Sequence, residues 1–325
     1  MKTASFTVQG LPLRLQCDGS IYSLVSSYLN TLSNGESHLR IDHLELHLDV
    51  LQESSQIPND AVQAIKSPSI TFYSKGSSIY LSSIDGSLVH LDPIDRKSRG
   101  YLSKEILNDT ERLFSLITAT LVKMLEYHSI HFLHAAALES HGVGFLISGD
   151  GGCGKTTTSL SLLRAGFKYL SDDSLFFTDV HDRIEVYPLS NKLHIDKDLS
   201  RRFPELMNGK KQPIPEKTKL PVDVSEIYPG SFITHMTPNV IIFPKITLHD
   251  KTKIHPLEQI QAYNKLLTQT ILSFDKNIAE KQLKILQKLV SKTLSYELFS
   301  GKDVYKNPSL LIDVISNLKK NNEYN

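Results

Sequence analysis

Short apolar runs alternate with turn dipeptides over the first hundred residues of the chain. The runs lie at 5–8, 13–17, 43–51, 69–73, 78–81 and 87–91, and Asp-Gly, Asn-Gly and Lys-Gly pairs separate several of them. Such alternation is typical of strands joined by tight turns. The segment 21–32 differs, because its apolar residues recur at helical spacing. The pattern predicts a small, mostly antiparallel sheet with one helix. We interpret it as an accessory or substrate-recognition domain, or as a purely structural one.

The pattern changes to that of a helix at 103–127, where apolar residues form one continuous face. A buried strand is predicted next, at 130–138, and it carries His131 and His134. A chain of 325 residues commonly forms two domains. We therefore expect a β-rich domain with its linking helix at 1–125 and a second domain at 126–325.

The second half of the chain opens with a strand, a glycine-rich turn and a helix. The apolar run 143–148 precedes GDGGCGKTTTS, and helical spacing follows at 156–164 until Gly166 ends it. A strand at 168–173 is expected to return beside the first strand, as in a βαβ crossover. The prediction continues with a hairpin at 174–178 and 183–187, a strand at 239–248, and helices at 255–273, 277–299 and 309–320.

The glycine-rich turn fits the phosphate-binding template G-x-x-x-x-G-K-[ST]. Gly149, Gly154, Lys155 and Thr156 fill its fixed positions. In this template backbone N–H groups hold phosphates, the lysine reaches the β- and γ-phosphates, and the hydroxyl binds Mg²⁺. A chance match is the alternative, but the flanking strand and helix are the context that the motif requires. The residues expected to bind nucleotide are Gly149, Asp150, Gly151, Gly152, Cys153, Gly154, Lys155, Thr156 and Thr157.

Composition narrows the class of protein without identifying a ligand. Hydrophobic residues make up 40% of the chain and charged residues 22%, which is ordinary for a globular protein and too apolar for disorder. The formal net charge of +1 gives no bulk argument for nucleic-acid or membrane binding. We find neither a long apolar run nor a signal-peptide pattern, so a cytoplasmic location is expected. The two cysteines, Cys17 and Cys153, are too few for a disulfide framework.

Two adjacent carboxylates, Asp172 and Asp173, end the strand that follows the phosphate-binding segment. Phosphoryl transfer to an alcohol needs one carboxylate near Mg²⁺ and a base that orients the acceptor hydroxyl. Neighbouring residues of a regular strand point in opposite directions, so this pair suits the two tasks. An exposed turn is the alternative interpretation.

Two stretches together resemble a known family. HAAALESHGVGFLISGDGGCGKT, followed by RAGFKYLSDD, is similar to the catalytic domain of HPr kinase/phosphorylase and its relatives. These relatives include kinases that phosphorylate a serine of lasso-peptide precursors. VYPLSNKLHID, the His-Ala-Ala start and the β-rich first half resemble this branch most. The resemblance is clearest over 134–173. It implies an α/β fold, a P-loop kinase core with a central mixed sheet, preceded by a smaller β-rich α+β domain at the N-terminus.

The resemblance also implies a role for each site residue. Lys155 contacts the γ-phosphate of ATP, and Thr156 is a ligand of Mg²⁺. Asp172 is the general base that orients the acceptor serine, and Asp173 is a partner of the metal or of Lys155. His134 matches the family histidine beside the phosphates.

The chain departs from the family after residue 187. It has no counterpart of the L-E-x-R-G-L-G-I segment of the bifunctional HPr enzymes, so neither dephosphorylation nor HPr as substrate is implied. PLSNKLHIDKDL is the nearest positional equivalent. Further candidates are Asp196 or Asp198 as a second acidic metal contact and Lys192, Arg201 or Lys245 as a phosphate clamp. The segment 197–220 carries seven Lys or Arg residues against three acids. It is interpreted as a lid or acceptor-binding surface, or as a solvated loop.

The sequence thus predicts an ATP- and Mg²⁺-dependent serine kinase that acts on a peptide or protein, with a ribosomal peptide precursor as the preferred acceptor. A homo-oligomer is compatible with the family. Two alternatives remain open: a non-catalytic nucleotide-binding regulatory protein, and a small-molecule kinase of the same fold.

Overall fold

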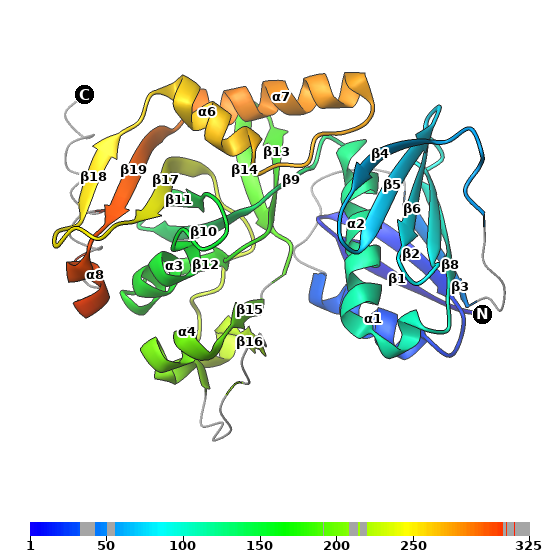
Figure 1. Cartoon of the computed structure of the whole chain (residues 1–325), viewed down its shortest axis with the longest axis horizontal. Coiled ribbons are helices and arrows are strands. Elements are labelled where there is room, and N and C mark those ends of the chain that lie inside the picture. The colour runs from blue at the N-terminus through cyan, green and yellow to red at the C-terminus, as the bar shows by residue number, and fades with distance from the viewer. Residues whose placement is uncertain are drawn as a thin grey trace. The chain divides into compact units, whose positions relative to one another are not determined.

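The computed structural model describes residues 1–32, 43–50, 56–190, 192–207, 214, 220–307, 310 and 315 (Figure 1). The chain forms two compact units. The first comprises Met1–His131 and Leu272–Gln282, and the second comprises Phe132–Ile271 and Leu283–Asn325. The first unit thus includes a short segment from the second half of the sequence. The expected division into a domain at 1–125 and a domain at 126–325 stays a prediction.

One sheet dominates the first unit (Figure 1). Its described strands are β1 (Lys2–Val8), β2 (Leu11–Cys17), β3 (Leu44–Val50), β4 (Val62–Lys66), β5 (Ile70–Lys75), β6 (Ser78–Ser83), β7 (Leu88–Asp92) and β8 (Lys97–Leu102), in the order β1-β2-β3-β8-β7-β6-β5-β4. The β2–β3 and β3–β8 pairs are parallel and the other pairs are antiparallel. The expected mostly antiparallel sheet is therefore confirmed, although β4 and β8 were not predicted.

The helices predicted in the first unit are present. In α1 (Tyr22–Leu32) Val25, Leu29 and Leu32 are buried, as helical spacing requires. The 3₁₀ turn η1 (Ile106–Asn108) leads into α2 (Thr110–Glu126), whose N-cap Asp109 accepts a hydrogen bond from the N–H of Arg112. Among the described residues no helix is long and apolar enough to span a membrane.

A mixed sheet forms the centre of the second unit. Its described strands are β10 (Ala135–Ser140), β11 (Val143–Ser148), β12 (Lys168–Ser171), β17 (Pro238–Ile246), β18 (Lys253–Pro256) and β19 (Leu294–Ser300), in the order β12-β10-β11-β17-β19-β18. β11, β17 and β19 run parallel, whereas β10 is antiparallel to both of its neighbours. The predicted α/β fold with a central mixed sheet is confirmed.

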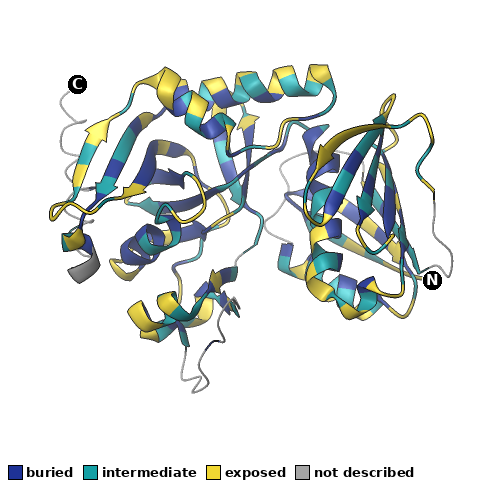
Figure 2. Ribbon diagram, viewed as in Figure 1, coloured by how far each residue is buried: buried dark blue, intermediate teal, exposed yellow. Residues whose placement is uncertain are grey.

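Side chains alternate between the two faces of this sheet, and each face carries a buried apolar core. Figure 2 shows that its central strands are largely buried. Phe145 and Ile147 of β11 belong to a core shared with α3 (Lys155–Arg164). Leu146, between them, belongs to the core shared with α6 (Gln259–Leu267) and α7 (Lys276–Ser291). Helices on both faces therefore hold β11 in place, and the phosphate-binding segment follows its last residue.

Three sequence predictions for the second half are wrong. The expected strand 130–138 is two strands, β9 (His131–Leu133) and β10, with a break at His134. The strand β12 does not lie beside β11, because β10 forms a hairpin with β11 and takes that position. The expected helices at 255–273 and 277–299 are shorter: β18 occupies the start of the first, α6 ends at Leu267, and β19 occupies the end of the second.

The remaining described elements include the predicted hairpin and the short segments that follow it. They are β13 (Leu175–Val180), β14 (Arg183–Pro188), β15 (Lys192–Ile195), α4 (Lys197–Arg202), η2 (Pro204–Met207), β16 (Leu220–Asp223), α5 (Val224–Ile227) and α8 (Lys302–Lys306). The predicted hairpin at 174–178 and 183–187 is confirmed, and its turn lies at His181-Asp182. Parts of two predictions, the basic segment at 208–213 and 215–219 and most of the helix 309–320, lie outside the described residues.

Candidate active site

The phosphate-binding segment is a turn between the end of β11 and the start of α3. Gly152 and Gly154 have φ angles of 77° and 105°, a region that side-chain-bearing residues rarely adopt. This conformation directs the turn into the first residue of α3, Lys155. The exposed N–H groups and the dipole at a helix N-terminus favour phosphate.

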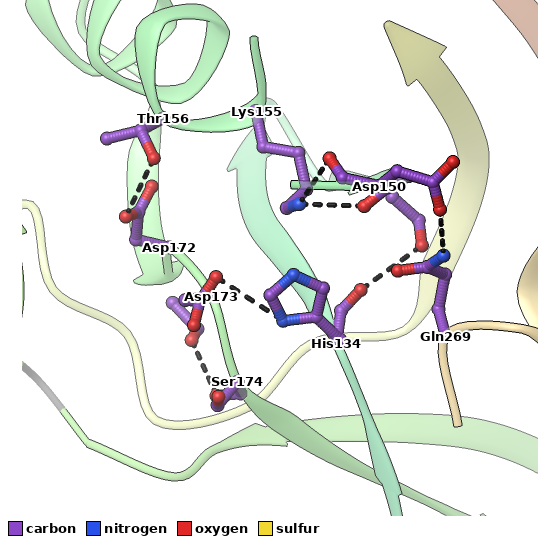
Figure 3. Close-up of polar contacts among 11 residues, drawn as sticks. His134, Asp150, Lys155, Thr156, Asp172, Asp173, Ser174 and Gln269 are labelled. Carbon is purple, nitrogen blue, oxygen red and sulfur yellow. Dashed lines mark hydrogen bonds and ion pairs between the residues drawn. The ribbon is translucent and has the colours of Figure 1, made fainter. Parts of the chain in front are cut away.

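The ammonium group of Lys155 folds back over the loop. Its Nζ donates to the main-chain oxygens of Gly149 at 2.7 Å and Asp150 at 3.2 Å (Figure 3). The side chain is buried, with 7% exposure. An ammonium group has three donors, so phosphate oxygens at the mouth of the loop can replace these carbonyls as acceptors.

Thr156 and Asp172 form a hydroxyl–carboxylate pair beside the loop. Thr156 Oγ1 donates to Asp172 Oδ2 at 3.2 Å, and Asp172, just after β12, is only 6% exposed (Figure 3). Hydroxyl and carboxylate oxygens are ligands that Mg²⁺ prefers, and this ion is commonly held by one or two carboxylates plus phosphates. The pair therefore fits Mg²⁺. No cluster of three or more His, Cys, Asp or Glu side chains with metal-site geometry occurs in the described part of the chain.

His134 and Asp173 form a second pair. Nδ1 of His134 lies 3.3 Å from Oδ1 of Asp173, whose side chain is 62% exposed (Figure 3). Burial lowers the pKa of His134, the nearby Asp173 carboxylate opposes that effect, and Lys155 adds to it. Since the ordinary pKa is 6.5, the neutral imidazole prevails at pH 7.

A pocket of about 520 Å³ brings these groups together. It is lined by His134, Gly151, Gly152, Gly154, Lys155, Thr156, Thr157, Asp172, Asp173, His194, Asp196, Asp198, Leu199, Arg202 and Ile246. Gly149, Asp150 and Cys153, on the other side of the loop, line a separate cavity of about 310 Å³. The residues expected from the sequence are thus split between two cavities that share the phosphate loop.

The structure also locates the candidates from the divergent segment. The Asp196 carboxylate caps α4, accepting from the N–H groups of Asp198 at 3.0 Å and Leu199 at 2.9 Å. Lys245 lines the smaller cavity and lies over the ring of Phe299. Neither Lys192 nor Arg201 is among the described residues that line the larger pocket, whereas Arg202 is.

Sequence reasoning missed Arg202 and His194 as pocket residues. Asp198 and Leu199 precede Arg202 by four and three residues, so both lie beside Arg202 on α4, and all three line the pocket. The cap at Asp196 fixes where this helix begins and therefore which side chains face the pocket. Without the helix start, the sequence could not show that Arg202 rather than Arg201 lines it. His194 gave no comparable signal.

Comparisons with known proteins find partial matches in sequence. No family model matches the chain. The HPr kinase/phosphorylase of Pediococcus pentosaceus is 42% identical over 79 residues, which is 24% of this chain and 22% of that protein. The enzyme of Lacticaseibacillus casei is 36% identical over 78 residues (24% and 21%), and that of Clostridium perfringens 32% identical over 77 residues (24% and 20%). The solved structure of the HPr(Ser) kinase/phosphatase from Coxiella burnetii is 13% identical, with a TM-score of 0.33, over 59% of this chain and 98% of that one.

The curated matches confirm the resemblance predicted from the motifs. The chain is similar to these enzymes over about a quarter of its length, and the matched part spans about a fifth of the length of these relatives.

Proposed function

We propose that this chain is an ATP- and Mg²⁺-dependent kinase that transfers the γ-phosphoryl group of ATP to a serine hydroxyl of a peptide or protein. One observation carries the proposal: a single pocket is lined by Gly151 to Lys155 of the phosphate loop except Cys153, by the Thr156–Asp172 pair and by the His134–Asp173 pair. The first two features suit nucleotide binding in general. The third supplies a carboxylate that an incoming hydroxyl can reach, which transfer requires and mere binding does not.

On the donor side, the loop N–H groups hold the phosphates and Lys155 exchanges its carbonyl partners for the γ-phosphate. Thr156 and Asp172 would hold Mg²⁺, which, when bound, neutralises charge on the β- and γ-phosphate oxygens. Burial of Asp172 and its contact with Thr156 favour this role for Asp172. The roles of the two aspartates are therefore proposed in the reverse of the order that the family resemblance implies.

On the acceptor side, Asp173 is the proposed base and His134 orients it. The serine oxygen bonds to the γ-phosphorus, its proton passes to Asp173, and the bond to the ADP oxygen breaks. The exposure of Asp173 leaves its carboxylate accessible to a polypeptide acceptor. The neutral His134 donates from Nδ1 to the carboxylate and so fixes its direction. A ribosomal peptide precursor as acceptor, a homo-oligomeric assembly and a cytoplasmic location are part of the proposal, which the family resemblance supports.

The two aspartates give a test that separates their roles. Asp173→Asn should keep Mg²⁺-ATP affinity within about threefold and lower phosphoryl transfer at least about 100-fold, because only the base is lost. Asp172→Asn should weaken Mg²⁺-dependent nucleotide binding, and Lys155→Ala should abolish turnover. Binding is measured with a fluorescent nucleotide and transfer with γ-labelled ATP and candidate peptides, read as mass steps of one phosphate.

The opposite result would reassign the base. If Asp173→Asn transferred phosphate at the wild-type rate while Asp172→Asn bound nucleotide normally and lost transfer, Asp172 would be the base. Normal nucleotide binding with no label on any peptide or protein would favour the regulatory alternative. Label on a small alcohol alone would favour the small-molecule kinase.

A further inference from the structure

Gln269 lies just after α6, at a position that the proposed reaction does not use. Its main-chain oxygen accepts the N–H of His134 at 2.8 Å. Its side-chain Nε2 donates to Asp150 Oδ1 at 2.9 Å (Figure 3). The same Nε2 also donates to Thr268 Oγ1 at 3.1 Å. The residue is 8% exposed. One buried side chain and its backbone thus contact both the phosphate loop and the histidine of the second pair.

The contact with His134 holds the backbone at a break between two strands. His134 lies at the break between β9 and β10, and its N–H bonds to Gln269 rather than to a neighbouring strand. The hydroxyl of Thr270 donates to the main-chain oxygen of Phe132, two residues before His134. The chain after α6 therefore runs along this break and holds the backbone from which the imidazole projects toward Asp173.

The contact with Asp150 acts on Lys155. The main-chain oxygen of Asp150 accepts hydrogen bonds from Lys155 Nζ at 3.2 Å and from the N–H of Cys153 at 3.3 Å. Because Gln269 holds the carboxylate of the same residue, the peptide that holds Lys155 is also fixed. A hydrogen bond to an ionised carboxylate is stronger than a neutral one, so this link is well suited to restrain the loop.

We propose that Gln269 is a positioning residue that sets the spacing between the phosphate loop and the His134–Asp173 pair. The inference rests on the proposed kinase function and deepens it, since donor and acceptor must be aligned for transfer. A displacement of about 1 Å in such an arrangement can lower a rate about 100-fold. Gln269 acts on alignment, so its effect falls on turnover more than on nucleotide affinity.

Gln269→Leu removes the hydrogen bonds of the side chain without overpacking the site, because the cavity of about 310 Å³ borders Gln269. We expect kcat to fall about 10- to 100-fold while KM for ATP stays within about threefold. Gln269→Glu should lower kcat further, since it places a carboxylate against Asp150. Combining Gln269→Glu with Asp150→Asn restores an amide–carboxylate pair and should recover much of the rate. Gln261→Leu, the same change at an exposed position of α6, is the matched control.

Hydrogen exchange gives a readout that needs no acceptor. Gln269→Leu keeps the main-chain bond to His134 and loses the side-chain bond to Asp150, so exchange should increase most over 149–156, less over 132–138, and stay unchanged over 2–17. A uniform increase, no increase, or no recovery in the double variant would overturn the inference. If the wild-type protein transferred no phosphate, the proposed function would fail, and local exchange would still decide whether Gln269 restrains the two segments.

Discussion

Gly144 shows how a single residue without a side chain sets the packing of the central sheet. A Cβ atom at this position would lie 2.3 Å from the main-chain oxygen of Thr237 and 3.2 Å from the sulfur of Met236. The N–H of Gly144 donates to Asn239 Oδ1 at 2.8 Å. The start of β11 and the start of β17 therefore approach more closely than any side chain permits.

Gly144→Ala should consequently destabilise the second unit. Relieving the contact with Thr237 requires the backbone to move, and we expect the free energy of unfolding to fall by about 1 to 3 kcal/mol. Gly19→Ala is the control, because a Cβ there would meet no atom within 4 Å and its φ is not positive. Chemical denaturation of both variants measures the difference. Equal stability of the two variants would contradict this account of the β11–β17 contact.

At the residue scale, the sequence predicted those site residues that lie at fixed spacings within one short stretch of the chain. Lys155 and Thr156 follow β11 through a fixed turn, and the aspartate pair follows one helix and one strand later, so the motifs alone brought these residues together. Gln269 reaches the same site from 119 residues beyond Asp150. A buried glutamine after an amphipathic helix has no sequence signature, so only the structure reveals it.

At the scale of elements, the hairpin β13–β14 is held to α7 by charge. The turn residues His181 and Asp182 have φ angles of 47° and 69°, the left-handed conformation that a two-residue hairpin turn needs. Asp182 lies 2.6 Å from Nζ of Lys288 and 2.7 Å from Nζ of Lys292. Hydrogen bonds from Lys288 and then Lys292 lower the pKa of Asp182 to about 2.

The stabilising effect of Asp182 should therefore depend on pH. Because the pKa of this carboxyl is lower in the folded state than its ordinary value of 3.8, the contribution is complete above pH 4 and is lost as the pH falls toward 2. Asp182→Asn, which keeps the turn tendency, should melt below the wild type at pH 7, and this difference should shrink with acid. Lys288→Met should lower the melting temperature as well, less than additively with Asp182→Asn. A difference independent of pH would contradict the role of these ion pairs.

The element that the sequence misassigned, β19, shows where local pattern fails. LSYELFS continues the apolar repeat of α7, and alone it suits a helix as well as a strand. Pairing decides, because β19 lies between β17 and β18 and its backbone bonds to both. The strand β8 was missed for a different reason. Its buried positions include Ser98 and Gly100, so buried and exposed residues alternate along it although apolar and polar residues do not.

At the scale of the whole molecule, the chain enters the first unit twice. The second entry, Leu272–Gln282, is fixed by Phe274, whose ring lies 4.3 Å from Nζ of Lys123 and 5.8 Å from the ring of Phe72. Lys123 also donates to Glu126 at 2.7 Å, and both side chains are 1% exposed. Because Phe274 packs against Lys123 and Phe72 of the first unit, we expect this segment to unfold together with that unit.

Nucleotide should therefore stabilise the two units unequally. The groups proposed to bind ATP and Mg²⁺ all belong to the second unit. Ligand at about 100 times its dissociation constant adds about 2.7 kcal/mol to the free energy of unfolding of the unit that binds it, which corresponds to a rise in melting temperature of about 5 to 10 °C.

Pulsed hydrogen exchange during heating assigns the shift in melting temperature to peptides of each unit. Peptides from 272–282 should unfold with those of 1–131, and nucleotide should not change their melting temperature, although they lie within the second half of the sequence. Lys155→Ala should remove the shift from the second unit. A common shift of both units would show that they unfold as one and would contradict the division.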